Sequence, residues 1–396
     1  MEERYTEGMP LSAPPCALYV HLPWCVRKCP YCDFNSYEAD VLPVTRYLEA
    51  LILDLEAECA FQKPGLIHSI FFGGGTPSLF PGSALAQLLH EIRQRLMLAP
   101  GCEITLEANP GASDAASFEA CLVAGVNRIS IGAQSFDDTQ LKTLGRVHGA
   151  ADIGRAVAAA RAAGCDNLNL DIMYGLPQQT PAGLSHDLAC AFALAPAQLS
   201  LYQLTLEPGT PFAHRPPQLP NETILEQLEE RLSEAARHGY QRYEISAYAR
   251  PGRACLHNLN YWQYGDYIGI GAGAHGKRTT AETIWRTRKP RQPEHYMASA
   301  GNAATAAGLR QPVAAADRPF EFMLNALRLV EGFSLALFES RCGLAAATLS
   351  KPLARAQELG LITWQDQQVR PTAHGLRFLN DLQSLFLPAA AACHRA

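Results

Sequence analysis

Short apolar runs alternate with stretches of helical spacing through the first half of the chain. The runs predict buried strands over 17–22, 66–72, 103–106, 126–131, 167–172 and 198–204. Between them, apolar residues recur every three or four positions, which predicts amphipathic helices such as the one over 44–61. Strands that alternate with helices in this way are typical of parallel βα units. The pattern therefore predicts an α/β fold, a partial (β/α)6 TIM-like barrel.

The pattern changes in the last third of the chain. Residues 281–314 are rich in Ala, Gly, Thr and Pro and weakly patterned, so we expect a linker there. Residues 315–388 predict three helices, a hairpin and a final helix, which is the order of a small winged-helix-like domain. The resulting division is an N-terminal tail (1–16), a barrel with its extension (17–280), the linker, the C-terminal domain and a tail (389–396).

Composition restricts the function. The 396 residues are 48% hydrophobic and 18% charged, so a large core is expected and general disorder is not. The net charge of -5, with acids and bases balanced in the C-terminal domain, argues against binding nucleic acid. The N-terminus lacks the apolar core of a signal peptide, and no apolar run approaches the ~20 residues of a membrane span. We expect a cytoplasmic protein without an integral membrane segment.

Three cysteines lie in a loop directly after the first predicted strand. Cys25, Cys29 and Cys32 have the spacing C-x3-C-x2-C, and position 34, where a further cysteine would extend the pattern, is Phe34. Thiolates at this spacing can converge on an iron–sulfur cluster, and three of them would leave one iron open to a small molecule. A disulfide-bonded loop and a zinc site completed by His21 are the alternatives at this point.

A second group of polar residues follows the predicted strands. Gly73-Gly74-Gly75-Thr76-Pro77 ends the second strand, and it lacks the Lys-Ser or Lys-Thr of a phosphate loop. Further along, Glu107, Gln134, Arg146 and Asp171 lie at or beyond successive strand ends, where α/β barrels build their active sites. The acids suit an amine or ribose hydroxyls, and the arginine suits a carboxylate. We therefore expect a polar ligand beside the cysteines.

Together these motifs resemble the radical S-adenosylmethionine (SAM) superfamily, in the branch that contains oxygen-independent coproporphyrinogen III oxidase. The resemblance is carried by the cysteine motif and Gly-Gly-Gly-Thr-Pro and covers about 17–276. It implies that Cys25, Cys29 and Cys32 hold a [4Fe-4S] cluster whose open iron is chelated by SAM. It also implies a SAM pocket formed by Tyr19, Tyr31, Gly74, Gly75, Thr76, Glu107, Gln134, Arg146 and Asp171.

Two differences from the oxidase indicate which subfamily of this branch the chain resembles. The oxidase carries a fourth cysteine where this chain has Phe34, and a long extension where only eighteen residues precede Tyr19. Both features, with His257-Asn-Leu-Asn-Tyr261-Trp262, resemble the HemW subfamily of haem chaperones. That resemblance implies a protein that binds haem and delivers it to haem-requiring membrane enzymes, such as respiratory oxidases. It allows a homodimer and peripheral contact with the membrane during delivery.

His257 is a candidate axial ligand because neutral imidazole commonly binds haem iron, and Tyr261 and Trp262 offer flat surface to the macrocycle. The alternative for this motif is a hydrogen-bonded corner of the core. No catalytic residue is assigned.

Two other functions are kept as alternatives. One is oxygen-independent coproporphyrinogen III dehydrogenase, which makes protoporphyrinogen IX in porphyrin biosynthesis. The other is a winged-helix regulator that uses the cluster as a redox sensor, which the even charge of the C-terminal domain disfavours.

Overall fold

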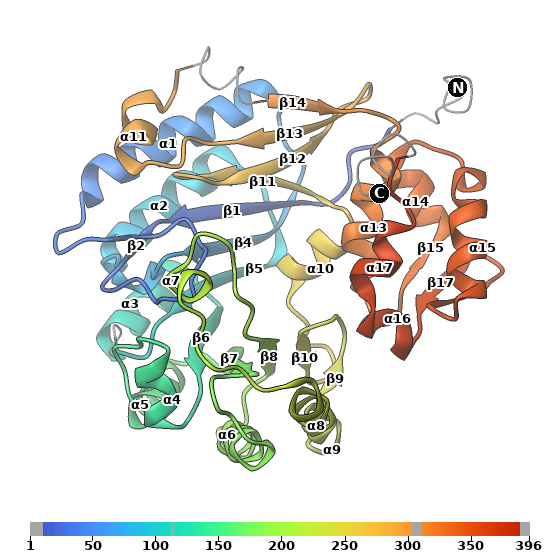
Figure 1. The fold of residues 1–396 in the computed structure, drawn as a ribbon. Coiled ribbons are helices and arrows are strands. Elements are labelled where there is room, and N and C mark those ends of the chain that lie inside the picture. Colours follow the sequence, from blue (N-terminus) through green and yellow to red (C-terminus); the bar gives the residue numbers. More distant parts are fainter. Residues whose placement is uncertain (1–10, 112–114, 303–309, 389–396) are drawn as a thin grey trace.

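The computed structural model describes residues 11–111, 115–302 and 310–388, and its centre is one twisted sheet (Figure 1). Six of its strands are parallel and adjacent in chain order. They are β1 (Cys16–Leu22), β4 (Ile67–Gly74), β5 (Leu98–Ala108), β6 (Arg128–Gln134), β7 (Leu168–Tyr174) and β8 (Gln198–Gln203). The described strands do not close into a ring. The predicted partial (β/α)6 barrel is therefore confirmed.

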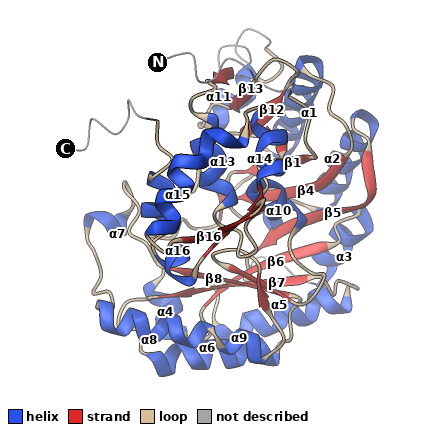
Figure 2. Cartoon of the chain, turned by 90° about the vertical axis from the view of Figure 1, so that its right-hand side faces the viewer, coloured by secondary structure: helices blue, strands red, loops and turns tan. Residues whose placement is uncertain are grey.

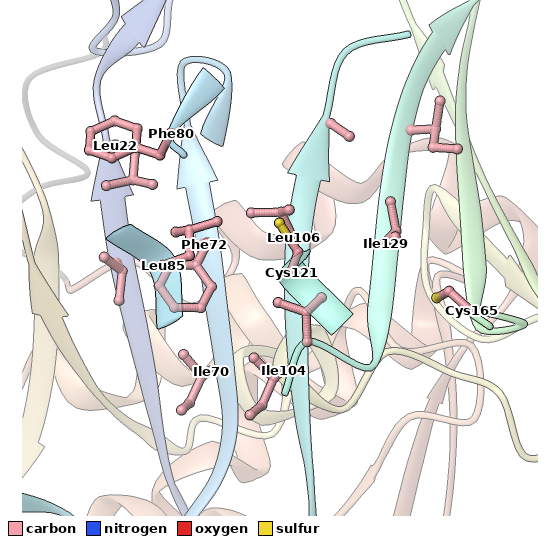
Figure 3. Close-up of a cluster of buried hydrophobic side chains, with 14 of the residues drawn as sticks. Leu22, Ile70, Phe72, Phe80, Leu85, Ile104, Leu106, Cys121, Ile129 and Cys165 are labelled. Carbon is pink, nitrogen blue, oxygen red and sulfur yellow. The ribbon is translucent and has the colours of Figure 1, made fainter. Parts of the chain in front are cut away.

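Helices connect these strands and cover one face of the sheet (Figure 1). They are α1 (Val44–Phe61), α2 (Gly82–Arg95), α3 (Ala115–Ala124), α4 (Asp138–Thr143), α5 (Ala150–Ala162) and α6 (Pro181–Ala193). Side chains alternate between the two faces of a strand, so every second residue points toward the helices. Figure 3 shows this apolar layer, in which Ile70, Phe72, Ile104, Leu106 and Ile129 are at most 3% exposed.

The sheet extends beyond the six parallel strands at both edges. Beyond β8 lie β10 (Ala247–Ala249) and β9 (Gln241–Arg242), both antiparallel to their neighbours. Beyond β1 lie β11 (Asp266–Ile270), which is parallel to β1, and then β12 (His275–Thr279), β13 (Ile284–Arg288) and β14 (Arg310–Val313). The linker expected over 281–314 is therefore corrected: its described part supplies β13, α11 (Pro293–Ser299) and β14.

Buried ion pairs explain why this extension was missed in the sequence. Lys289 Nζ lies 2.5 Å from Asp54 Oδ1 and 2.7 Å from Glu58 Oε1, and all three side chains are nearly inaccessible. Lys277 Nζ lies 2.9 Å from Asp266 Oδ1, also buried. Charged residues normally indicate a solvent-exposed position, but here each charge is compensated inside the protein by a partner from another element.

The C-terminal domain has the predicted winged-helix-like order (Figure 2). Its elements are α13 (Arg318–Ala326), β15 (Phe333–Ser334), α14 (Leu335–Cys342), α15 (Ser350–Glu358), β16 (Ile362–Gln365), β17 (Gln368–Pro371), α16 (Ala373–Arg377) and α17 (Leu379–Ser384). Its apolar core continues into Leu11, Tyr264 and Ile284 of the preceding parts of the chain. Glu321 Oε2 accepts hydrogen bonds from Tyr264 and from Arg286, so the domain is fixed against the sheet extension.

The remaining elements are short. They are β2 (Trp24–Cys25), β3 (Tyr37–Glu38), α7 (Pro211–His214), α8 (Glu222–Leu232), α9 (Glu234–Arg237) and α10 (Leu256–Trp262). Among the described residues, the structure contains no helix with the length and apolar character needed to cross a bilayer. The tail predicted over 389–396 lies outside the described residues, as do positions 1–10 of the N-terminal tail.

Lys289→Met tests the buried charge cluster. Removing the ammonium leaves two buried carboxylates without their shared partner, so the free energy of unfolding should fall by about 3 kcal/mol in urea at pH 7. The control is Arg46→Met, which breaks an exposed 2.7 Å pair with Glu294 and should cost less than about 1 kcal/mol. Equal losses in the two variants would contradict this account of the sheet extension.

Candidate functional site

A cavity of about 810 Å³ lies on the face of the sheet that the helices leave uncovered. At one end it is lined by Cys25, Cys29 and Cys32, and at the other by Trp262 and Arg328. Figure 1 shows β2, which carries Cys25, and α10, which ends at Trp262, toward opposite ends of β1. The cavity therefore runs along the strands, from the cysteine loop to the contact with the C-terminal domain.

The cysteine loop is fixed by backbone contacts. The short parallel pair of β2 and β3 closes it, and the Cys32 amide donates to the Cys29 carbonyl over 3.1 Å. Lys28 Nζ donates to the carbonyls of Phe34 and Ser36. The three thiols are free and partly buried. In the part of the chain that the structure describes, no three potential ligands lie close enough together to hold a single ion. The thiols thus surround one end of the cavity without converging on a point.

His21 lies beneath the glycine turn and does not line the cavity. Its Nε2 is 2.8 Å from the Asn35 carbonyl and its Nδ1 is 2.9 Å from the Tyr19 hydroxyl, so both ring nitrogens are engaged. Nothing in this geometry favours the zinc site with His21. Gly74 has φ +121°, and a Cβ there would lie 2.6 Å from the His21 ring. At Gly75 a Cβ would meet the Trp24 carbonyl at 2.5 Å. The backbone passes so close to His21 and Trp24 that glycine is required at both positions.

Two polar side chains at strand ends lack full partners. Glu107 receives one hydrogen bond, from the Gly74 amide at 3.2 Å, and burial together with the nearby Asp171 raises its pKa to about 8. Gln134 ends β6 with φ +67°, a conformation that is strained for a residue with a side chain. Its buried Oε1 has no hydrogen-bond partner. Strain and unpartnered atoms at one place are typical of a ligand site.

Arg146 connects the strand ends with the cysteine loop. Its Nη2 donates to Asn109 Oδ1 over 2.9 Å and to the Gly132 carbonyl over 3.0 Å, and its Nη1 is 3.7 Å from Cys29 Sγ. The buried Nε has no partner. Gly132 makes room, because a Cβ there would lie 3.0 Å from Gln134 Nε2. The guanidinium is therefore held in place while part of its hydrogen-bonding capacity stays available to a carboxylate.

The predicted SAM residues are brought together with one exception. Tyr31, Gly74, Gly75, Thr76, Glu107, Gln134, Arg146 and Asp171 all line the cavity with the three cysteines. Tyr19 does not: its ring packs beside Phe71 and His257, one layer below the cavity surface. The structure thus gives Tyr19 a supporting position through His21.

Sequence reasoning missed the polar residues along the length of the strands. The inward positions of β6, β7 and β8 that line the cavity include Arg128, Ser130, Asn169, Ser200 and Tyr202. Asn169 donates to Asp171 Oδ1 over 2.7 Å and accepts from Ser200. The signal was a polar residue at every second position of strands that were interpreted as wholly buried. That alternation indicates one apolar face and one face toward a polar cavity.

The three haem candidates occupy different environments. His257 is 1% exposed, with Nδ1 3.0 Å from Ser69 Oγ and Nε2 3.0 Å from the Tyr261 hydroxyl, and burial lowers its pKa to about 3. Neither His257 nor Tyr261 lines the cavity, whereas Trp262 does. His257 and Tyr261 thus have the geometry of the hydrogen-bonded corner that was the alternative, and Trp262 alone faces the space for a ligand.

Family models and relatives match this chain over most of its length. The model of the radical SAM superfamily matches residues 19–189, and that of the HemN C-terminal domain matches residues 313–378. Heme chaperone HemW of Escherichia coli K12 is 46% identical over 95% of this chain and 99% of its own length. Heme chaperone HemW of Haemophilus influenzae is 44% identical over 94% and 98%.

A solved structure shares the fold. Coproporphyrinogen III oxidase (HemN) from Escherichia coli, described as a radical SAM enzyme, superposes with a TM-score of 0.79 and covers 96% of this chain and 91% of its own. The two sequences are 21% identical, so this likeness concerns the fold alone.

Glu107→Gln tests the environment of Glu107 in protein free of ligands. A carboxyl whose pKa rises from 4.5 to about 8 on folding contributes full stability below pH 4.5 and loses it as the pH rises toward 8. The glutamine variant escapes this loss. It should be more stable than the original protein by roughly 2 kcal/mol at pH 8, with the difference disappearing near pH 4.5.

Urea unfolding at both pH values measures this difference. The control is Glu49→Gln on the exposed side of α1, which should show the same difference at both pH values. If the Glu107 variant is no more stable than the original protein at pH 8, burial does not disfavour the ionised carboxylate in the folded protein.

Proposed function

Because this chain belongs to the HemW heme chaperone family of the radical SAM superfamily, we propose that it holds a [4Fe-4S] cluster, SAM and haem together in the elongated cavity and delivers haem to other proteins. The observation that carries the proposal is the shape of this cavity. It begins at the three cysteines, passes the polar strand ends and continues to Trp262 and the C-terminal domain. A site for a cluster and SAM alone would need only the part of the cavity between the cysteines and the strand ends.

Cys25, Cys29 and Cys32 are the residues that would hold the cluster. Three free, partly buried thiols at one end of the cavity fit a polynuclear group with one open iron. When bound, the cluster supplies an electron and a Lewis-acidic iron. Arg146, 3.7 Å from Cys29 Sγ and without an ion pair among the described residues, adds a positive charge beside the thiolates.

The strand ends supply what SAM requires. Arg146 can meet the carboxylate with its unpartnered Nε, and the Gly74–Gly75 backbone allows a polar group to approach closely. Glu107, Gln134 and Asp171 present oxygens to the amine and the ribose hydroxyls. Burial and the nearby Asp171 raise the pKa of Glu107, so a positively charged ligand beside it would stabilise its ionised form.

Haem is assigned to the remaining part of the cavity. Phe71 and Trp262 give this part apolar surface for a flat macrocycle. His257 supports the α10 corner and does not face this space, so we assign it no iron ligation. The proposed recipients are haem-requiring membrane enzymes, reached by peripheral contact with the membrane.

Replacing each cluster cysteine by serine should abolish the cluster. After anaerobic reconstitution with iron and sulfide, the original protein should contain about four iron atoms per chain and the variants far fewer, measured by iron and sulfide analysis and visible absorption. Cys190→Ser, on α6 and away from the cavity, is the matched control and should reconstitute fully. A full cluster in the Cys29 variant would contradict the assignment.

Anaerobic titration with haem tests the chaperone function itself. The reconstituted protein should bind haem with a saturable change in Soret absorbance, and it should release no CO2 from coproporphyrinogen III in the presence of SAM and a reductant. If haem does not bind, the proposed function fails. Catalytic formation of protoporphyrinogen would instead establish the dehydrogenase.

A further inference from the structure

The far end of the cavity contains a buried arginine that forms no close ion pair among the described residues. Arg128, at the start of β6, is 3% exposed and lines the cavity. Its Nη2 donates to Gln198 Oε1 over 2.7 Å and its Nη1 to Thr105 Oγ1 over 3.4 Å, and both acceptors are neutral. Among the ion pairs of the described residues, none includes Arg128. Glu103 and Asp171 attract the guanidinium from beyond ion-pair distance, so they offset part of its charge and leave its hydrogen-bonding capacity available to a ligand.

The other unsatisfied atoms at this end are also donors. Arg128 Nε, Trp262 Nε1 and Arg328 Nε are each buried and without a hydrogen-bond partner, and all three residues line the cavity. Arg328 reaches in from the C-terminal domain and lies 4.2 Å above the Trp262 ring. Three N–H groups without acceptors require a ligand that brings acceptors, which is what a carboxylate does.

A further acid at this end, Glu244, is paired with a different arginine. Glu244 is 3% exposed and uses Oε2 for Arg328 Nη2, at 3.2 Å, and Oε1 for the Ser246 amide, at 3.0 Å. The Glu244–Arg328 pair is therefore neutral. The pair also connects the two domains, because Glu244 and Leu329 form a β-bridge. Arg128 therefore keeps a buried donor free, and Glu103 and Asp171 offset part of its charge.

We infer that Arg128, Arg328 and Trp262 form a carboxylate-binding end of the cavity, which takes the acid side chains of haem; this inference rests on the proposed function. The macrocycle would lie toward the thiol end, and its carboxylates would point to the amino ends of the strands. One of the three donors belongs to the C-terminal domain. The domain would therefore contact the ligand directly.

A purely structural role for Arg128 makes a different prediction. If its bonds to Gln198 and Thr105 held the sheet together, its loss would lower the stability of the empty protein. If it serves a ligand, Arg128→Gln should also lower the preference for haem over an analogue without carboxylates, which the loss of a purely structural residue would not change.

The test compares haem with its dimethyl ester, in which both carboxylates are neutral, in the same detergent buffer. The original protein should bind haem about tenfold or more tightly than the ester. Arg128→Gln should weaken haem binding by about the same factor and leave ester binding unchanged. Arg128→Lys, which keeps the charge, should recover part of the preference. Trp262→Phe keeps the ring and loses the N–H, so it should lower the preference as well.

The matched control is Arg278→Gln, a buried arginine of β12 away from the cavity that lies 3.7 Å from Glu58. It should melt at a lower temperature and keep the preference for haem. Equal affinity of the original protein for haem and for the ester would overturn the inference. So would an Arg128→Gln variant whose affinity for both ligands falls by the same factor. If neither ligand binds the original protein, the proposed function fails instead.

Discussion

The structure depends on one constraint: each parallel strand must satisfy two different environments at alternate positions. On one face, residues such as Leu106 and Ile129 pack under the helices in a continuous apolar layer (Figure 3). On the other face, α10 packs against one end of β1 and β4, and the side chains of the strands form a polar cavity wall. Polar groups in such a wall must bond to one another or to a ligand, because leaving them unpaired is costly.

The charges in this wall have an order along the strands. Glu107 and Asp171 lie between Arg146, which is next to the cysteine loop, and Arg128, which is at the opposite end. Burial and the nearby Asp171 raise the pKa of Glu107, and each of the two arginines has a buried Nε without a hydrogen-bond partner. The cavity therefore has free donors at both ends and a carboxyl of raised pKa between them. A cationic ligand near the acids and anionic groups at the two arginines would complete it.

Much of this arrangement could be predicted from the sequence. The apolar runs located the six parallel strands, and parallel pairing places their carboxyl ends together, so Glu107, Gln134 and Arg146 could be assigned to one site. Strands β12 and β13 could not be predicted, because Lys277 and Arg278 of β12 and Lys289 directly after β13 look solvent-exposed until their buried partners are known. The far end of the cavity was missed for a related reason. It combines Arg128, Trp262 and Arg328, which are distant in sequence and belong to three different elements.

The central claim is that the cluster and haem occupy the same cavity, spaced along the strands. The six residue steps from Arg128 to Gln134 span about 20 Å. Pulsed dipolar EPR between the reduced cluster and bound copper(II) protoporphyrin measures this spacing directly in the full chain. The account predicts a distance of roughly 10–20 Å. A distance above about 30 Å, which exceeds the length of the strands, would place the porphyrin outside the cavity and contradict the account.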